Sequence, residues 1–399
     1  MKKNILVGVC GGIAAYKICQ VVSDLKKHNF EIDTVMTKNA VNFVSPLTFQ
    51  TLSQNPVSID MFDHMARNDV HHISLAEKAQ IFLIAPATAN IIGKLACGIA
   101  DDLWTTTALA FRGQLIIAPA MNTRMYTHPA VVKNIEILKK RGAIFIEPTS
   151  GLLACGDVGI GKLADISDIV DAVLFYAQKT DEFKNKKIVI TAGHTIEDLD
   201  PVRYLTNRST GKMGYALAKR ATVRGADVTL ISGETQLKKP YGIKTFIHVR
   251  SAEDMYGAVK HEFEDADILI KAAAVADYTP KTVSHEKIKK SNGNMTIEMK
   301  RTSDILLKMG EIKKVGQIIV GFSAETENIE QNTLKKLKTK NADIMVSNDV
   351  SLKDAGFASD TNRVSLFFKD KPVKTISKMS KLDIADKILD NVLELIETK

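Results

Sequence analysis

Three segments in the first half of the chain join an apolar run to a turn whose residues could bind a ligand. The runs and their turns are Ile5–Val9 with Cys10–Gly12, Ile81–Ala85 with Pro86–Asn90, and Gln114–Ala118 with Pro119–Asn122. Proline ends a strand because it has no N–H to donate to the ladder. Parallel sheets bind ligands at the carboxyl ends of their strands. The pattern therefore predicts one pocket with two similar walls, and ordinary strand-ending turns are the alternative.

Gly11 and Gly12 precede a predicted amphipathic helix over residues 13–28. Glycine lets a ligand approach the backbone closely, and a helix N-terminus favours an anion. The dinucleotide pattern G-x-G-x-x-G is not met, because Cys10 occupies its second glycine position. This argues against NAD and leaves open a site for the phosphate of a mononucleotide.

Ser150–Gly161 is rich in glycine and predicts a mobile lid rather than a core element. Gly156–Lys162 matches the start of a P-loop, but Leu163 replaces the required Ser or Thr and no buried strand precedes the segment. We therefore reject a P-loop. Cys155 lies in the middle of this lid, where a thiol has little core to pack in, so it is a candidate reactive group.

His71 and His72 stand just before a predicted helix. Adjacent histidines point in different directions and make a poor metal pair. One of them could serve as a base or a substrate anchor, and a solvated histidine at a helix start is the alternative.

The second half carries a similar set of polar strand ends and helix starts. Asn207, Ser209 and Thr210 precede a helix, so their side chains and the free N–H groups form a predicted anion cradle, with plain N-capping as the alternative. Ala272–Tyr278 combines tiny side chains with Asp277, which favours a ligand ring lying flat on the backbone. Glu286–Lys290 places three lysines on an irregular segment, although most lysines are merely solvated.

Short apolar strands alternate with helices through both halves, which predicts an α/β protein with two parallel, doubly wound, Rossmann-like sheets. The charged stretch Asp181–Lys187 separates them, so we expect domains at residues 1–186 and 187–399. Further strands are expected at Phe30–Met36, Ala143–Glu147, Ile188–Ala192, Asp227–Ser232, Ile268–Ala273, Ile318–Phe322 and Ile344–Val346. Further helices are expected at residues 39–52, 253–264, 304–315, 328–341 and 381–396.

Composition narrows the class of protein. The 399 residues carry 54 Lys and Arg against 46 Asp and Glu, a net charge of +8. Basic residues are not interleaved with aromatic ones, so we expect phosphorylated small molecules as partners and no nucleic acid. Four cysteines without Cys-x-x-Cys spacing argue against disulfides and zinc. With neither a signal peptide nor an apolar run of spanning length, we expect a cytoplasmic protein without membrane contact.

The first half resembles the homo-oligomeric, flavin-containing cysteine decarboxylases. The resemblance is carried by Gly11–Lys17, Ala85–Thr88, Pro119–Asn122 and Ala154–Asp157. It implies a flavodoxin-like domain that binds FMN at subunit contacts, through Gly11, Gly12, Thr37, Pro86, Ala87, Thr88, Ala120 and Met121. It assigns the chemistry to His72, Asn122 and Cys155. His71 stands where a Gly commonly precedes the catalytic His, and Lys162 where an Arg commonly closes the lid motif.

These residue types suit the implied reaction. A carboxylate derived from a simple amino acid loses CO2 only when the electrons left behind have somewhere to go, and oxidised flavin can take two electrons from the carbon that bears the thiol. The amide N–H of Asn122 can hold the departing carboxylate, and His72 can assist thiol deprotonation. Cys155 can then donate a proton to carbon.

The second half resembles the phosphopantothenate–cysteine ligases. The resemblance is carried by Asp200–Arg203, Asn207, Ala274–Tyr278, Glu286–Lys290 and Gly321–Thr326. The order of the two halves is similar to that in the bifunctional coenzyme A biosynthesis enzymes of bacteria, over nearly the whole chain. That family ligates cysteine to 4'-phosphopantothenate with CTP and Mg2+ through an acyl-cytidylate, and then decarboxylates the product to 4'-phosphopantetheine. We expect no dedicated metal site, because the nucleotide phosphates would hold most of the Mg2+ coordination.

The resemblance also implies roles for residues of the ligase half. Asn207 would hold the acyl-cytidylate, Asp277 would contact the nucleoside, and Lys287 would act on the phosphates as a catalytic group. The remaining nucleotide contacts implied are Ala272, Ala273, Ser303, Asp304, Ile305, Phe322, Lys336 and Lys340. It further implies trimeric contacts between flavin domains and dimeric contacts between ligase domains, which together can build a dodecamer.

Two alternatives stand against this interpretation. An oxidoreductase that uses NAD or a nucleotide sugar would need a G-x-G-x-x-G turn, and neither half has one. A regulatory flavin-binding protein without catalysis would not need both Asn122 and Cys155.

Overall fold

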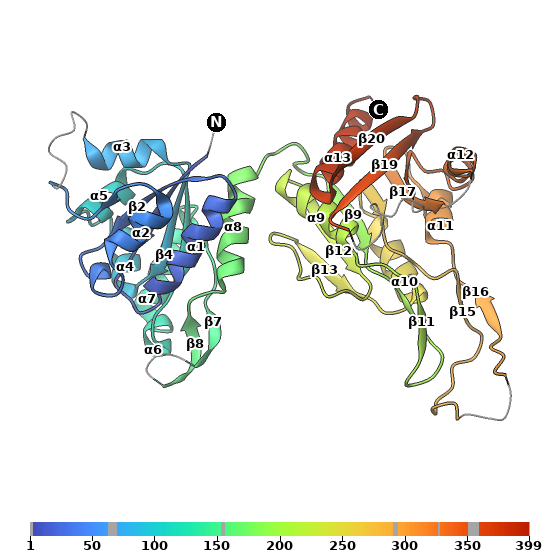
Figure 1. Cartoon of the computed structure of the whole chain (residues 1–399), viewed down its shortest axis with the longest axis horizontal. Coiled ribbons are helices and arrows are strands. Elements are labelled where there is room, and N and C mark those ends of the chain that lie inside the picture. Colours follow the sequence, from blue (N-terminus) through green and yellow to red (C-terminus); the bar gives the residue numbers. More distant parts are fainter. Residues whose placement is uncertain are drawn as a thin grey trace. The chain divides into compact units, whose positions relative to one another are not determined.

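The computed structural model describes residues 3–62, 70–152, 156–289, 294–325, 328–349 and 359–398. The chain forms two compact units, Met1–Gln178 and Lys179–Lys399, each an α/β fold (Figure 1). The segment just before residue 187 packs with the second unit rather than the first. The Phe183 side chain is fully buried in the core of that unit, and the Arg224 guanidinium donates to Glu182 at 2.6 Å.

The first unit contains six parallel strands in the order β3-β2-β1-β4-β5-β6. They are β1 Asn4–Val9, β2 Glu31–Met36, β3 Val57–Ser58, β4 Ile81–Ala87, β5 Gln114–Pro119 and β6 Ile144–Phe145. The parallel, doubly wound sheet expected from the alternation of strands and helices is confirmed. The strand order reverses between β1 and β4, and a ligand crevice is expected at their carboxyl ends.

Helices cover both faces of this sheet (Figure 1). One face carries α1 Ala15–Lys27, α2 Pro46–Ser53 and α8 Ile166–Gln178. The other carries α3 His71–Lys78, α4 Ala89–Cys97, α5 Leu103–Ala110 and α7 Pro129–Lys140. The single helix expected over residues 39–52 was wrong: a short 3-10 turn, Ala40–Asn42, precedes α2. A new helix begins there because Pro46 suits a first helical position and the Ser45 hydroxyl accepts from the Leu47 N–H.

The glycine-rich segment expected as an irregular lid is a two-stranded antiparallel ribbon outside the main sheet. Its strands are β7 Thr149–Leu152 and β8 Val158–Lys162. The geometry of the ribbon requires glycine at position 161. Gly161 has φ +135°, and a Cβ on it would lie 2.2 Å from the Met121 carbonyl oxygen. Cys155 lies outside the described residues.

The second unit contains an eight-stranded sheet in the order β13-β12-β9-β14-β17-β18-β19-β20. The strands are β9 Lys187–Ala192, β12 Asp227–Ser232, β13 Thr245–His248, β14 Ile268–Lys271, β17 Ile318–Glu325, β18 Ile344–Asp349, β19 Thr361–Phe368 and β20 Lys374–Ser380. The first six are parallel, and all of them except β13 were expected from the sequence. The last two are antiparallel additions at one edge, which the sequence reasoning did not predict.

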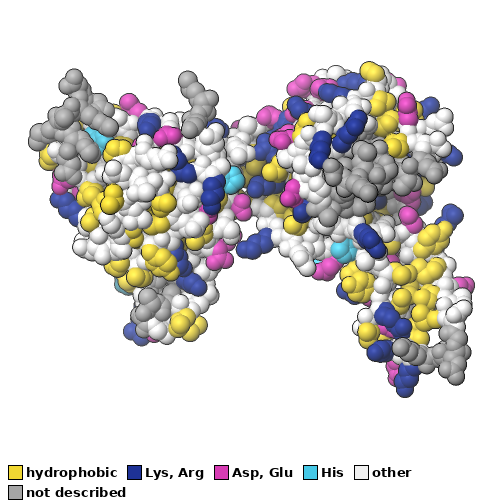
Figure 2. All heavy atoms as spheres, in the orientation of Figure 1, with side chains coloured by type: hydrophobic (Ala, Val, Ile, Leu, Met, Phe, Trp, Pro, Cys, Tyr) yellow, Lys and Arg dark blue, Asp and Glu magenta, His cyan; other side chains and the backbone are white. Residues whose placement is uncertain are grey.

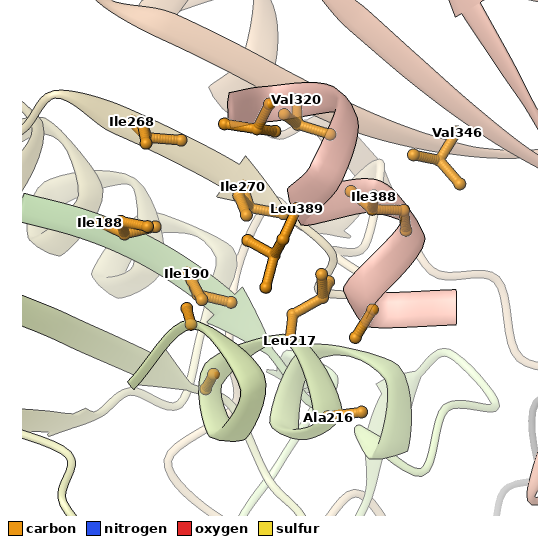
Figure 3. Close-up of a cluster of buried hydrophobic side chains, with 14 of the residues drawn as sticks. Ile188, Ile190, Ala216, Leu217, Ile268, Ile270, Val320, Val346, Ile388 and Leu389 are labelled. Atoms are coloured by element: carbon orange, nitrogen blue, oxygen red, sulfur yellow. The ribbon is translucent and has the colours of Figure 1, made fainter. Parts of the chain in front are cut away.

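Both faces of the second sheet are also covered. On one face α9 Lys212–Val223 and α13 Lys381–Glu397 pack together, and Figure 3 shows Leu217 and Leu389 among the isoleucines of β9 and β14. On the other face lie α10 Ala252–Phe263, α11 Ile305–Ile312 and α12 Ile329–Thr339. No helix in the described ranges has the length and apolar character needed to span a membrane.

Two small antiparallel pairs project from the second unit: β10 Ile196–Asp198 with β11 Tyr204–Thr206, and β15 Tyr278–Pro280 with β16 Met299–Arg301. These two strand pairs and their loops form a projecting arm, and hydrophobic side chains gather on it (Figure 2). The exposed apolar residues of the arm are Val202, Tyr204, Leu205, Tyr278, Val283 and Met295.

Candidate active sites

The first unit has a cavity of about 590 Å³ at the carboxyl ends of β1, β4 and β5. A second cavity of about 370 Å³ adjoins it and shares Gly11 and Thr88 with it. Between them the two cavities are lined by most of the predicted flavin contacts: Gly11, Gly12, Thr37, Thr88, Ala120 and Met121. Residues of both proline-containing turns, Thr88–Ala89 and Ala120–Asn122, line the larger cavity together.

Backbone hydrogen bonds hold the rim of this site together. The Ala120 N–H donates to the Ala87 carbonyl at 3.0 Å, and the Met121 N–H donates to the Gly161 carbonyl at 3.0 Å. Ala87 and Pro86 are thus placed behind the rim and do not line either cavity. At Gly11 a Cβ would lie 2.5 Å from the Asn39 Cβ, so only glycine fits where the turn after β1 passes residue 39.

Asn122 lies at the N-cap of the short helix α6, Thr123–Tyr126, and lines the larger cavity. Its Oδ1 accepts from the Arg124 N–H at 2.8 Å, so the amide orientation is set by the helix start. Its Nδ2 donates to Oδ2 of Asp157 at 3.2 Å. The Asp157 carboxylate therefore accepts from the same amide N–H that was predicted from the sequence to hold a substrate carboxylate.

The structure separates the two neighbouring histidines. The Nε2 of His71 and the Ser58 hydroxyl lie 2.7 Å apart in a hydrogen bond that ties α3 to β3. His71 therefore has a structural contact that His72 does not share. His72 is half-buried on α3 and is not among the described residues that line either cavity.

The second unit has two adjoining cavities at the carboxyl edge of its sheet, of about 430 and 360 Å³. The larger contains the start of α9, where the N-cap residue Gly211 has φ +76° and, lacking a side chain, provides no side-chain cap for the helix. It is lined by the predicted residues Asn207, Ala272, Ala273, Asp277, Phe322, Lys336 and Lys340. The smaller is lined by Asp277, Ser303, Asp304, Ile305 and Lys340. An uncapped helix start with several lysines suits a phosphate chain.

Asp304 links the two sides of the smaller cavity. Its carboxylate accepts from the Leu307 N–H at 3.1 Å and pairs with the Lys340 ammonium at 3.0 Å. Asn207 is fixed in the larger cavity, because its Nδ2 donates to the Val275 carbonyl at 3.0 Å. The residues that the structure describes contain no group of three or more His, Cys, Asp or Glu side chains placed to hold a metal ion.

Lys287 is exposed and does not line either cavity among the described residues, but the segment that carries it is firmly anchored. The buried Asp200 carboxylate accepts from the Ile288 N–H at 3.1 Å, and the Arg203 Nη2 donates to the Ile288 carbonyl at 2.7 Å. Arg203 also donates to Asp200 at 2.6 and 3.0 Å. These bonds hold the pKa of Asp200 well below its usual range, so the pair stays ionised.

Sequence reasoning missed several residues of the second site. Lys271 lines both cavities, and its signal was a single charge at the end of an otherwise apolar strand. Asn348 was not predicted as a site residue, yet it lines the larger cavity with a buried Oδ1 that has no hydrogen-bond partner among the described residues. Asn362 and Lys381, from the unpredicted edge strand β19 and the start of α13, line the same cavity.

Comparisons with known proteins match both units. Residues 1–177 match the family described as "Flavoprotein", and residues 183–396 match "DNA/pantothenate metabolism flavoprotein C-terminal domain". The chain is 51% identical over 395 residues to the Bacillus subtilis coenzyme A biosynthesis bifunctional protein CoaBC, covering 98% of this chain and 97% of that protein. It is 44% identical over 371 residues to the Vibrio cholerae protein of that name, covering 92% of each. A crystal structure of a CoaBC C-terminal domain is 41% identical, covers 55% of this chain and all of that one, and has a TM-score of 0.48.

Proposed function

The chain belongs to the family of bifunctional coenzyme A biosynthesis proteins, and on that premise we propose which unit carries out which reaction. It is a bifunctional enzyme that catalyses two consecutive steps of coenzyme A biosynthesis, a ligation and a decarboxylation. We assign FMN-dependent decarboxylation of 4'-phosphopantothenoylcysteine to the first unit. We assign CTP-dependent ligation of cysteine to 4'-phosphopantothenate to the second. These assignments rest on the observation that each unit has a cavity at the carboxyl edge of its sheet, lined by residues of the expected types.

The first cavity fits a flavin mononucleotide. Gly11 and Gly12 line the cavity without side chains, while Thr37 and Thr88 offer hydroxyl groups to polar atoms of the cofactor. FMN bound there would accept two electrons from the thiol-bearing carbon of the substrate and return them. Asn122 would turn its amide N–H from Asp157 to the substrate carboxylate, and Cys155 would protonate the carbon left after CO2 loss.

We propose that His72 acts in a neighbouring copy of the chain. Within one copy, His72 is not among the described residues that line the cavity, and His71 is hydrogen-bonded to Ser58. Exposed apolar residues near α3 and the cavity, among them Ile13, Tyr16 and Val70, support burial against a second copy. The exposed apolar arm of the second unit supports a separate pairing of ligase units.

In the second unit the carboxylate of 4'-phosphopantothenate would attack the phosphate next to the ribose of CTP, releasing pyrophosphate. Negative charge moves onto phosphate oxygens in this step, so lysines and Mg2+ held by the phosphates are suited to stabilise it. Asn207 would hold the acyl-cytidylate, which the cysteine amine then opens. No nucleophile of the protein is needed. The comparisons give no support to the alternative of an NAD-dependent oxidoreductase.

The absorbance spectrum of the purified full-length protein tests the assignment of the first unit. We expect a yellow protein with a flavin band, and release of CO2 from supplied 4'-phosphopantothenoylcysteine. In the second assay, pyrophosphate release should require CTP, 4'-phosphopantothenate and Mg2+, and should be slower with ATP. A colourless protein that stays colourless with added FMN would rule out the flavin assignment, and pyrophosphate release only from ATP would rule out CTP.

Asp200→Asn is expected to lower the ligation rate by about 10²-fold. The segment that carries Lys287 would lose the charged carboxylate that accepts from the Ile288 N–H and holds the segment in place. Misplacing a catalytic group by about 1 Å has costs of this size. Decarboxylation of supplied 4'-phosphopantothenoylcysteine should be unchanged. Asp198→Asn is the matched control, since Asp198 pairs with the exposed Arg250 at 2.7 Å and does not touch the segment. Equal ligation rates in the two variants would contradict the anchoring role.

A further inference from the structure

Lys271 occupies an unusual position for a lysine. It ends the central strand β14, after the fully buried Ile268–Ile270, and pairs in register with Thr191 of β9 and Gly321 of β17. Strands on both sides keep its backbone fixed at the carboxyl edge of the sheet. Its side chain lines both cavities of the second unit.

The ammonium group of Lys271 has no ion pair or hydrogen bond with the residues that the structure describes. Asp304, whose charge acts on it, is already paired with Lys340 at 3.0 Å. Burial first, and repulsion by Lys340 second, lower the pKa of Lys271 to about 8. A partly desolvated cation without a direct counter-ion is costly, and an anion bound in the cavity would offset that cost.

The two cavities meet at few residues. Those that line both are Lys271, Val275, Asp277 and Lys340. The smaller cavity, with Ser303 and Ile305, would take the nucleoside, and the larger, with the uncapped start of α9, would take the distal phosphates. The phosphate next to the ribose must then cross the junction. Lys340 contributes a charge there that Asp304 partly neutralises, whereas Lys271 has no such partner among the described residues.

We propose that Lys271 is a further catalytic residue of the ligase site, whose ammonium group holds the nucleoside triphosphate at the phosphate that is attacked. The inference rests on the proposed function of the second unit. A carboxylate oxygen of 4'-phosphopantothenate bonds to that phosphorus, and the bond from phosphorus to the bridging oxygen breaks. Pyrophosphate leaves with the electron pair. Lys271 keeps its proton throughout and stabilises the charge on the phosphate oxygens.

This role predicts a proton linked to nucleotide binding. The triphosphate raises the pKa of Lys271 from about 8, so at pH 8 the wild-type protein should take up about half a proton at this site on binding CTP. A lysine that only supports the fold would not change its protonation with ligand. Titration calorimetry in two buffers of different ionisation enthalpy measures this uptake without any turnover.

The experiment uses the full-length protein with Lys271→Met, Lys271→Arg and the control Lys244→Met, whose lysine is exposed and pairs with Asp227. Lys271→Met should lose the additional proton uptake, bind CTP at least about 10-fold more weakly, and release pyrophosphate about 10²-fold more slowly. Lys271→Arg should keep most of the affinity without the uptake, because arginine is always protonated. Lys244→Met should behave as wild type.

Wild-type proton uptake and affinity in Lys271→Met would overturn the inference while leaving the proposed function intact. Failure of the wild-type protein to bind CTP would overturn the proposed function of the second unit, and this inference with it. An unchanged flavin spectrum and thermal midpoint in each variant show that the fold is kept. If Lys271→Met fails this check, loss of the proton uptake in a folded Lys271→Arg supports the inference, and its retention there overturns it.

Discussion

Lys287→Gln is expected to slow pyrophosphate release from CTP by about 10²–10³-fold. Removing one charge-assisted contact to a phosphate in a partly desolvated site raises a transition state by about 2–4 kcal/mol. Lys287 suits this role because the next residue, Ile288, is fixed through both its N–H and its carbonyl by Asp200 and Arg203. An anchored backbone lets a long, exposed side chain close over the phosphates as a point charge.

Lys289→Gln and Lys290→Gln are the controls for this prediction. Lys289 is exposed on the other side of the anchored residue, whereas Lys290 lies outside the described residues. Pyrophosphate release with CTP and 4'-phosphopantothenate, measured side by side, should fall much less in these variants than in Lys287→Gln. The flavin spectrum and decarboxylation should be untouched in all three. Small, equal effects would mean that Lys287 is only another surface charge.

Cys155→Ser is expected to stop turnover after CO2 loss while leaving flavin binding intact. A serine hydroxyl has a far higher pKa than a thiol and is a poor proton donor to carbon. The ribbon strands on either side of this residue are ordered, and Asp157 reaches Asn122 at 3.2 Å. Asp157, two residues after Cys155 in the sequence, is therefore bound to the amide that we assign to the substrate carboxylate.

Mass spectrometry of the Cys155→Ser reaction should find a decarboxylated, oxidised thiol product together with reduced flavin. Asp157→Asn is a useful companion, because it keeps the shape of the contact with Asn122 and removes the carboxylate charge. It should affect substrate binding more than product release. Release of 4'-phosphopantetheine by Cys155→Ser at a near wild-type rate would exclude the proton-donor role.

Much of the fold could be predicted because its strands are locally distinct. Buried parallel strands such as Ile81–Ala87 and Ile268–Lys271 are short apolar runs between helices, so their existence and direction followed from the sequence. The antiparallel strands β19 and β20 were missed because they lie at an edge, where β19 alternates in burial over its first half and β20 buries only Ile376. Exposed residues such as Arg363 and Lys378 lie between their apolar residues, so neither strand forms a continuous apolar run in the sequence. The break before Pro46 was visible in the sequence and was not used.

The sequence by itself determined which residues stand at strand ends, since a proline, a glycine or a lone charge after an apolar run is a local signal. Gly11, Thr88, Asn122 and Asp277 were placed at a cavity rim in this way, and Asn207 was placed there by its position before a helix. Only the tertiary structure decided which distant groups meet. Asp200 binds the backbone 88 residues further on, and Asn122 meets a carboxylate 35 residues away. Such contacts depend on how separate loops pack over the sheet edge, and local propensity carries no information about that packing.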